Sequence, residues 1–239
     1  MQTVIQSYQQ LGGVFITPPS VLTQKLSKIK ALIFDWDGVF NNGGKTHSIG
    51  SGFSEVDSMA INMLRFSLWL KNTNGERIKT VVITGENNGT AFSFAKREGF
   101  DAVYFQMKDK TKALAHFCST NGLQPDEVAF FFDDILDLSL AEKVGVRFQM
   151  KRTTGIAFNE FVAATKLADY ATAGDGANYG VREACELSMI LNASFDEVVN
   201  KRMAFEGEYS TFIAQRNAVT TTFWIMKGLE VTAVADPLI

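Results

Sequence analysis

The sequence contains little cysteine and proline and no long hydrophobic run. Among its 239 residues there are 2 Cys and 4 Pro. Cys118 and Cys185 are too far apart for a Cys-x-x-Cys metal site and too few for a disulfide framework, which favours a reducing compartment. The longest apolar runs, such as residues 128–132, are far shorter than the roughly 20 residues of a membrane span. Residues 1–19 contain no basic residue and no apolar segment before a cleavage site, so we predict a cytoplasmic protein without a secretory signal.

An excess of charge of one sign is also lacking. The chain has 23 Lys+Arg against 26 Asp+Glu, a net charge of −3, and no block of like charge. Proteins that bind nucleic acid or anionic membranes usually have a basic patch, so neither is an expected partner. The content of 46% hydrophobic and 21% charged residues is close to that of soluble globular domains and excludes disordered and fibrous proteins.

Short apolar runs alternate with amphipathic stretches, which is typical of an α/β fold. Uninterrupted runs predict strands that are buried on both faces of a parallel sheet. These runs are residues 31–34, 80–83, 102–105, 128–132 and 144–148. Helices are expected at residues 57–70, 87–98, 110–119, 138–143 and 181–191, and residues 168–172 predict an edge strand. We therefore predict a Rossmann-like three-layer sandwich with a mostly parallel central sheet.

Reactive polar side chains follow several of the predicted strands. They are Asp35, Asp37, Thr84, Lys110, Asp133 and Asp134. In an open α/β sheet, ligands bind beyond the carboxyl ends of the strands, so we expect these side chains to converge. Together they supply what phosphoryl transfer through an aspartyl-phosphate needs: a carboxylate nucleophile, a second carboxyl group for proton transfer, oxygen ligands for Mg²⁺ and donors for the phosphoryl oxygens.

These residues resemble the four motifs of the haloacid dehalogenase superfamily. Residues 33–39 (IFDWDGV) are similar to its first motif, residues 81–85 (VVITG) to its second, Lys110 to its third and residues 132–137 (FDDILD) to its acidic fourth. A single Asp-x-Asp-Gly is a weak signal, whereas four motifs in this order are a specific one.

The resemblance implies a role for each catalytic residue. Asp35 would attack phosphorus, and Asp37 would protonate the leaving alcohol and then deprotonate the attacking water. Thr84 and the amide of Gly85 would bind the phosphoryl oxygens, and Lys110 would neutralise the nucleophile and the transferred group.

The resemblance also implies a Mg²⁺ site. The ion would be bound by Asp35, Asp133 and the backbone carbonyl of Asp37, with Asp134 behind these ligands. For Asp137, the sequence leaves two roles open, support of a ligand or a helix cap.

Two further assignments have competitors. Lys108 and Lys112 flank Lys110, which we prefer for the third motif because Ala-Leu follows it at the superfamily's usual spacing. His47 and His116 are isolated and lack metal-ligand spacing.

A narrower resemblance covers about residues 29–191. Residues 53–57 (FSEVD), 168–172 (ADYAT) and 180–185 (GVREAC) are similar to 3-deoxy-D-manno-octulosonate 8-phosphate phosphatases. That group lacks a cap domain, as the short intervals between the motifs also predict for this chain. The resemblance implies a phosphorylated keto-sugar acid as substrate and a homotetramer in which each flap completes a neighbour's site.

The chain departs from this group at several positions. Glu86 follows the second motif where the group usually has Arg, which exchanges a cation that could bind a carboxylate for an anion. Trp36 places a large ring inside the nucleophile loop. Asn41 and Asn42 replace the usual Thr-Asp, and Phe132 replaces a usual Gly.

We predict a phosphoric monoester hydrolase that depends on Mg²⁺ and acts on a small sugar phosphate through an aspartyl-phosphate. Residues 30–192 would form the catalytic core, residues 1–29 a lead-in, and residues 193–239 a mostly helical tail that packs on the core or on a neighbouring subunit. The alternative is a phospho-accepting regulatory or binding module without turnover. Receiver domains of that kind place the phospho-accepting Asp after the third strand, where this chain has Gln106.

Overall fold

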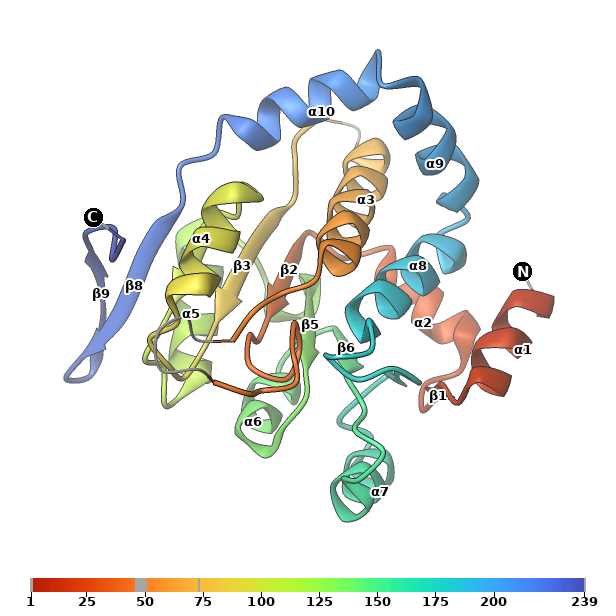
Figure 1. The fold of residues 1–239 in the computed structure, drawn as a ribbon, viewed down its shortest axis with the longest axis horizontal. Helices are drawn as coiled ribbons and strands as arrows, with labels where there is room; N and C mark the ends of the chain where they lie inside the picture. Colours follow the sequence, from red (N-terminus) through yellow and green to blue (C-terminus); the bar gives the residue numbers. More distant parts are fainter. Residues whose placement is uncertain (1, 46–50, 73, 239) are drawn as a thin grey trace.

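The computed structural model describes residues 2–45, 51–72 and 74–238, so His47 lies outside the described residues. In this part of the chain the strands are β1 (Val14–Phe15), β2 (Ala31–Phe34), β3 (Lys79–Ile83), β4 (Ala102–Tyr104), β5 (Val128–Phe132), β6 (Val146–Gln149), β7 (Tyr170–Ala171), β8 (Thr222–Lys227) and β9 (Glu230–Val234). They form one sheet in the order β1-β7-β6-β5-β2-β3-β4-β8-β9 (Figure 1). Neighbouring strands are parallel except at the two edges, where β1 and β9 run antiparallel to β7 and β8.

Helices cover both faces of the sheet. One face carries α2 (Pro19–Leu26), α3 (Glu55–Lys71), α4 (Gly89–Arg97), α8 (Gly180–Leu191), α9 (Phe195–Ala204) and α10 (Glu208–Asn217). The other carries α5 (Lys110–Asn121), α6 (Leu138–Ala141) and α7 (Ile156–Thr165), while α1 (Gln2–Leu11) precedes β1. Along β2, Leu32 and Phe34 enter the first core and Ala31 and Ile33 the second. The predicted three-layer α/β sandwich is therefore confirmed.

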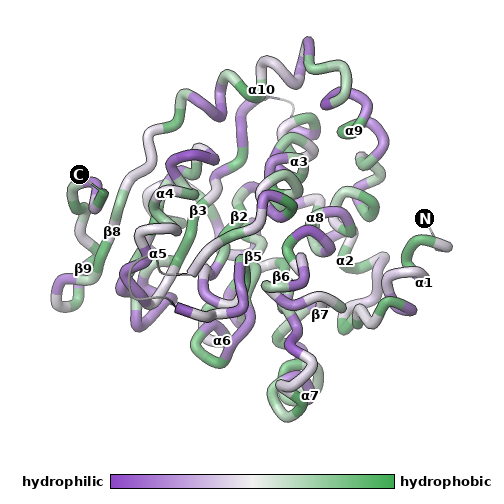
Figure 2. The backbone as a smooth tube through the Cα atoms, viewed as in Figure 1, coloured by the Kyte–Doolittle hydropathy of each residue, from purple (hydrophilic) through white to green (hydrophobic). Residues whose placement is uncertain are grey.

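Hydropathy follows these layers. Hydrophobic residues run along the central strands, and hydrophilic residues gather in the loops at the strand ends (Figure 2). Among the described helices, none is long and apolar enough to cross a membrane.

The five predicted strands correspond to β2 through β6, but residues 168–172 are not at an edge. β7 lies between β6 and β1, because the N-terminal segment returns to the sheet and pairs with it, Val14 opposite Ala171. The prediction of an edge strand was wrong because β1 is only two residues long and gives no sequence signal of its own. The helix α7 was not predicted either.

The C-terminal segment is helical only as far as Asn217, where α10 ends. Beyond it, β8 pairs in parallel with β4, Phe223 opposite Val103, and β9 pairs with β8. The prediction of a mostly helical tail was therefore wrong for the last part of the chain. The sequence does contain a hairpin signal, since Gly228 separates two stretches rich in β-branched and aromatic residues. In the structure its φ is +64°.

Candidate active site at the carboxyl edge of the sheet

The central strands bring the predicted motifs to one edge of the sheet. β2 lies between β3 and β5 and is parallel to both, with Phe34 opposite Val82 and Phe131. The amide of Asp35 continues this ladder by donating to the carbonyl of Phe131 at 3.0 Å. The residues that follow the three strands therefore share one edge, as predicted.

Lys110 joins two buried carboxylates. Its Nζ lies 2.5 Å from Asp35 Oδ1 and 2.5 Å from Asp137 Oδ1. The side chain of Lys110 is 4% exposed, and those of Asp35 and Asp137 are 9% and 1% exposed. Burial would lower the pKa of Lys110, but the two carboxylates outweigh it and raise that pKa above its ordinary value. Burial raises the pKa of Asp35 to about 7, against the opposing effect of Lys110.

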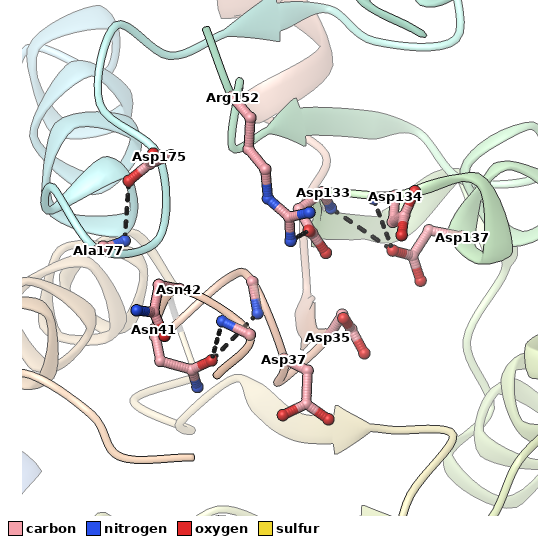
Figure 3. Close-up of polar contacts among 12 residues, drawn as sticks. Asp35, Asp37, Asn41, Asn42, Asp133, Asp134, Asp137, Arg152, Asp175 and Ala177 are labelled. Atoms are coloured by element: carbon pink, nitrogen blue, oxygen red, sulfur yellow. Dashed lines mark hydrogen bonds and ion pairs between the residues drawn. The ribbon is translucent and has the colours of Figure 1, made fainter. Parts of the chain in front are cut away.

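Three carboxylates form an acidic cluster in which the residues fit a divalent cation. An oxygen of each of Asp35, Asp133 and Asp137 lies within 4.8 Å of the other two (Figure 3). Asp133 Oδ1 is buried and has no hydrogen-bond partner among the described residues. Burial, followed by the charges of Asp35 and Asp137, raises the pKa of Asp133 to about 8. An oxygen-only donor set with an unpartnered buried oxygen is the chemistry that Mg²⁺ prefers.

The sequence put Asp134 behind the Mg²⁺ ligands and left the role of Asp137 open. In the structure Asp137 belongs to the acidic cluster and Asp134 does not. Asp134 is exposed, and its carboxylate accepts the amide of Ile135 at 2.7 Å, where the 3₁₀ turn η2 (Ile135–Asp137) begins. Asp137 Oδ2 accepts the amides of Asp133 and Asp134 at 3.4 and 3.3 Å, while its Oδ1 binds Lys110. Asp137 thus supports the fourth motif and also faces the acidic cluster.

Asp37 lies outside the acidic cluster and has its own set of donors. Ser51 Oγ donates to Asp37 Oδ1, and Asn88 Nδ2 donates to Oδ2 at 2.9 Å. Lys45 Nζ lies 3.3 Å from Asp37 Oδ2 and 3.7 Å from the carboxylate of Glu86. The carboxylates of the first motif therefore have separate surroundings: Asp35 faces Lys110, and Asp37 faces neutral donors and an exposed lysine.

Thr84 and Gly85 lie at the end of β3. Thr84 is 1% exposed, and its hydroxyl oxygen accepts the amide of Glu86 at 3.3 Å. Gly85 is half-buried, and Glu86 is exposed at the rim beside Lys45. These positions agree with phosphoryl binding by the second motif, which remains a prediction.

Arg152 is a site residue that sequence reasoning missed. It follows β6, is 40% exposed and forms an ion pair with Asp133 Oδ2 (Figure 3). Gly38 makes room for this pair: its φ is +89°, and a Cβ there would overlap Asp133 Oδ2 and the Arg152 guanidinium. The position of Arg152 depends on the strand order, so no local motif could have identified it.

Comparison with known proteins supports the same family. No family model matches the sequence. The chain is 26% identical over 179 residues to a 3-deoxy-D-manno-octulosonate 8-phosphate phosphatase of Salmonella typhimurium, which covers 75% of this chain and 88% of that protein. The phosphatase of the same name from Yersinia pestis is 27% identical over 171 residues, covering 70% and 83%.

Solved structures agree with these relatives. A Legionella pneumophila protein described as a hydrolase of the haloacid dehalogenase superfamily, subfamily III A, superposes with a TM-score of 0.61 at 27% identity, covering 77% of this chain and 94% of that chain. The 3-deoxy-D-manno-octulosonate 8-phosphate phosphatase of Moraxella catarrhalis, solved with magnesium, phosphate and a sugar acid, has a TM-score of 0.63 at 24% identity, covering 77% and 98%. At 24% identity, the likeness to the Moraxella catarrhalis structure shows the shared fold alone.

Proposed function

We propose that this chain, a haloacid dehalogenase-type phosphatase of the capless group, hydrolyses a small sugar phosphate through an aspartyl-phosphate on Asp35. The observation that carries the proposal is the buried arrangement of Asp35 with Lys110 next to Asp133, one oxygen of which has no partner among the described residues. A carboxylate nucleophile must be ionised to attack, and the ammonium group favours the ionised form of Asp35 at a buried position.

Each step of the proposed reaction is assigned to a residue of the site. Asp35 attacks phosphorus while the bond from phosphorus to the alcohol oxygen breaks, and Asp37 gives a proton to that oxygen. Asp37 then takes a proton from water, which attacks phosphorus and releases phosphate from Asp35. Lys110 would neutralise the charge that gathers near Asp35, and Thr84 and Gly85 would hold the phosphoryl oxygens.

A Mg²⁺ ion is the implied cofactor. Asp35, Asp133 and the backbone carbonyl of Asp37 would hold it, with Asp137 next to them and Asp134 on the outside. When bound, such an ion supplies a Lewis acid that polarises the phosphoryl group. Arg152 binds the other oxygen of Asp133 and so orients this carboxylate.

Two cationic side chains near Asp37 and Asp133 support an acidic sugar phosphate, such as a keto-sugar-acid phosphate, as the substrate. Lys45 is 43% exposed and lies between Asp37 and Glu86. Glu86 is the residue that argues against an acidic substrate, and Lys45 offsets its charge. Arg152, next to Asp133, adds a partly exposed guanidinium. A carboxylated substrate therefore has cationic partners even without an arginine at position 86.

We also propose a homotetramer, as the family resemblance implies. Several apolar side chains on α3, on α9 and directly after α9 are exposed and could be covered by neighbouring subunits. They are Val56 and Met59 of α3, Met203 of α9 and Phe205. Light scattering after size-exclusion chromatography measures the mass directly, and a monomer would contradict this proposal.

Phosphate release from a panel of sugar phosphates, with Mg²⁺ or with EDTA, tests the function. We expect Mg²⁺-dependent release in the parent protein and none in Asp35→Asn. Asp126→Asn is the matched control, because Asp126 is an exposed residue of η1 (Pro125–Glu127) at the opposite edge of the sheet. Activity that survives in Asp35→Asn would contradict the nucleophile. A stable phospho-protein without phosphate release would support the regulatory module instead.

A further inference from the structure

A tryptophan stands between the two aspartates of the first motif, and its side chain is fixed. Trp36 is fully buried. Its ring packs against Phe40, Phe94 and Phe53, with ring centroids 4.9, 5.5 and 6.4 Å away. A ring enclosed by other aromatic rings cannot change rotamer without opening the core, so the direction of its N–H bond is set by packing.

The indole N–H of Trp36 determines how Ser51 can hydrogen bond. Trp36 Nε1 donates to Ser51 Oγ at 3.1 Å, and both residues are buried. An indole nitrogen can only donate, so the serine oxygen accepts and keeps its own proton free. That proton is directed to Asp37 Oδ1, the second partner of Ser51 Oγ. The hydrogen bonds therefore run in one direction, from Trp36 through Ser51 to Asp37.

The backbone around Ser51 is held in place from two sides. Thr90 Oγ1 donates to the carbonyl of Ser51 at 2.5 Å, and Asn41 Nδ2 donates to the carbonyl of Gly52 at 3.0 Å. The first contact comes from α4 and the second from the nucleophile loop. The hydroxyl of Ser51 is thus a fixed donor rather than a rotor on a free loop.

The other oxygen of Asp37 has a fixed donor as well. Asn88, which is 3% exposed and lies at the start of α4, donates to Asp37 Oδ2. Lys45 Nζ lies 3.3 Å from the same oxygen, so both oxygens of Asp37 have donors, and these set the position and the plane of the carboxylate. Transfer of a proton to a leaving group requires heavy atoms about 2.6–3.2 Å apart and aligned, so this plane matters for the first chemical step.

We propose that Trp36 and Ser51 are positioning residues that aim Asp37 at the oxygen of the leaving group. This inference rests on the proposed role of Asp37 as the general acid. Both side chains are buried, and their effect on the reaction would pass through Asp37. Loss of these hydrogen bonds should therefore lower the rate of hydrolysis of substrates whose leaving group needs a proton. Hydrolysis of substrates whose leaving group needs none should change little.

Leaving-group dependence of kcat/KM tests the proposal. The probes are phenyl phosphate, which releases a basic phenolate, and p-nitrophenyl phosphate, which releases a stabilised anion. We expect Ser51→Ala and Trp36→Phe to lower kcat/KM for phenyl phosphate by ~10-fold or more and for p-nitrophenyl phosphate by less than ~3-fold. Ser51→Ala removes only a hydroxyl, so it remains informative if Trp36→Phe does not fold.

Matched controls separate this effect from general damage. Trp69→Phe also removes an indole donor, but its partners are Gly75 and Gln215, and Ser54→Ala removes a hydroxyl that caps α3. Both controls should keep the parent's ratio between the two substrates. An equal loss on both substrates in Ser51→Ala, or no loss on either, would overturn the proposal.

Two benchmark variants distinguish failure of this inference from failure of the proposed function. Asp37→Asn should show the same preference for p-nitrophenyl phosphate in a stronger form, and Asp35→Asn should be inactive on both substrates. If Asp37→Asn shows no preference, the acid role of Asp37 and the positioning role both fail. If Asp35→Asn stays active, the proposed function fails whatever the ratio is.

Discussion

Replacement of Lys110 by methionine tests whether this lysine holds the site together. Lys110 is 4% exposed and is placed between Asp35 and Asp137, both almost fully buried. Removal of one partner of a buried ion pair leaves an uncompensated charge and costs about 3–5 kcal/mol. Methionine has a similar length and no charge, so little of the loss would come from packing. We expect the free energy of unfolding of Lys110→Met to fall by about this amount at pH 8 in EDTA.

The loss in free energy of unfolding caused by Lys110→Met should grow as the pH rises. Burial already raises the pKa of Asp35 to about 7, and without Lys110 that pKa rises further. A carboxyl group whose pKa is higher in the folded than in the unfolded chain loses stability as the pH rises from its unfolded value through its folded value. The difference between the parent and Lys110→Met should therefore be largest at pH 8 and shrink towards pH 5.

Urea unfolding followed by tryptophan fluorescence, between pH 5 and pH 8, measures this difference. The matched controls are Lys108→Met and Lys112→Met, because both lysines are exposed and flank Lys110. Each control should stay within about 0.5 kcal/mol of the parent. The reasoning is refuted if Lys110→Met is as stable as the controls at pH 8, or if its deficit does not change with pH.

Two further predictions concern parts of the fold away from the site. Asp57 is fully buried, one of its oxygens accepts the amide of Arg182 and the other has no partner among the described residues, and burial raises its pKa to about 6 from 3.8. Asp57 should therefore contribute a loss of up to roughly 3 kcal/mol between pH 4 and pH 7, and in pH-dependent urea unfolding Asp57→Asn should lose less stability than the parent over this range by that amount. Phe223 of β8 is 3% exposed and packs against Phe92. Phe223→Ala should lower the free energy of unfolding by about 3–5 kcal/mol, whereas Leu229→Ala, at a turn residue that is 90% exposed, should change little.

The central sheet could be predicted because its strands are buried on both faces. β2 and β5 coincide with continuous apolar runs of 4 and 5 residues, which are too short to be predicted as helices. The edges could not be predicted in the same way. β1 is formed by Val14 and Phe15 alone and exists only because β7 offers it a partner. Pairing between segments far apart in the sequence is a tertiary effect, and local composition carries little trace of it.

The same distinction applies to the site. Asp35, Asp133 and Lys110 follow strands directly or open a helix, so the rule that strand ends converge was enough to bring them together. Arg152 and Ser51 reach the site from loops whose course is set by packing. Their contacts with Asp133 and Asp37 depend on where β6 and α4 lie, and nothing in the local sequence marks them.

The electrostatics of the site limit how the proposed reaction can begin. The chain as a whole carries a net charge of −3, and screening confines any attraction to about 8 Å at physiological salt. Within that range, Asp35, Asp133 and Asp137 outnumber the cations that pair with them, Lys110 and Arg152. A divalent cation bound among these three carboxyl groups would favour their ionised forms and offset their charge before a phosphorylated substrate binds. Asp133 Oδ1, which has no donor within the described part of the chain, points the same way, because a buried carboxylate oxygen without a donor is costly until a cation binds it. The acidic cluster could therefore hold a divalent cation.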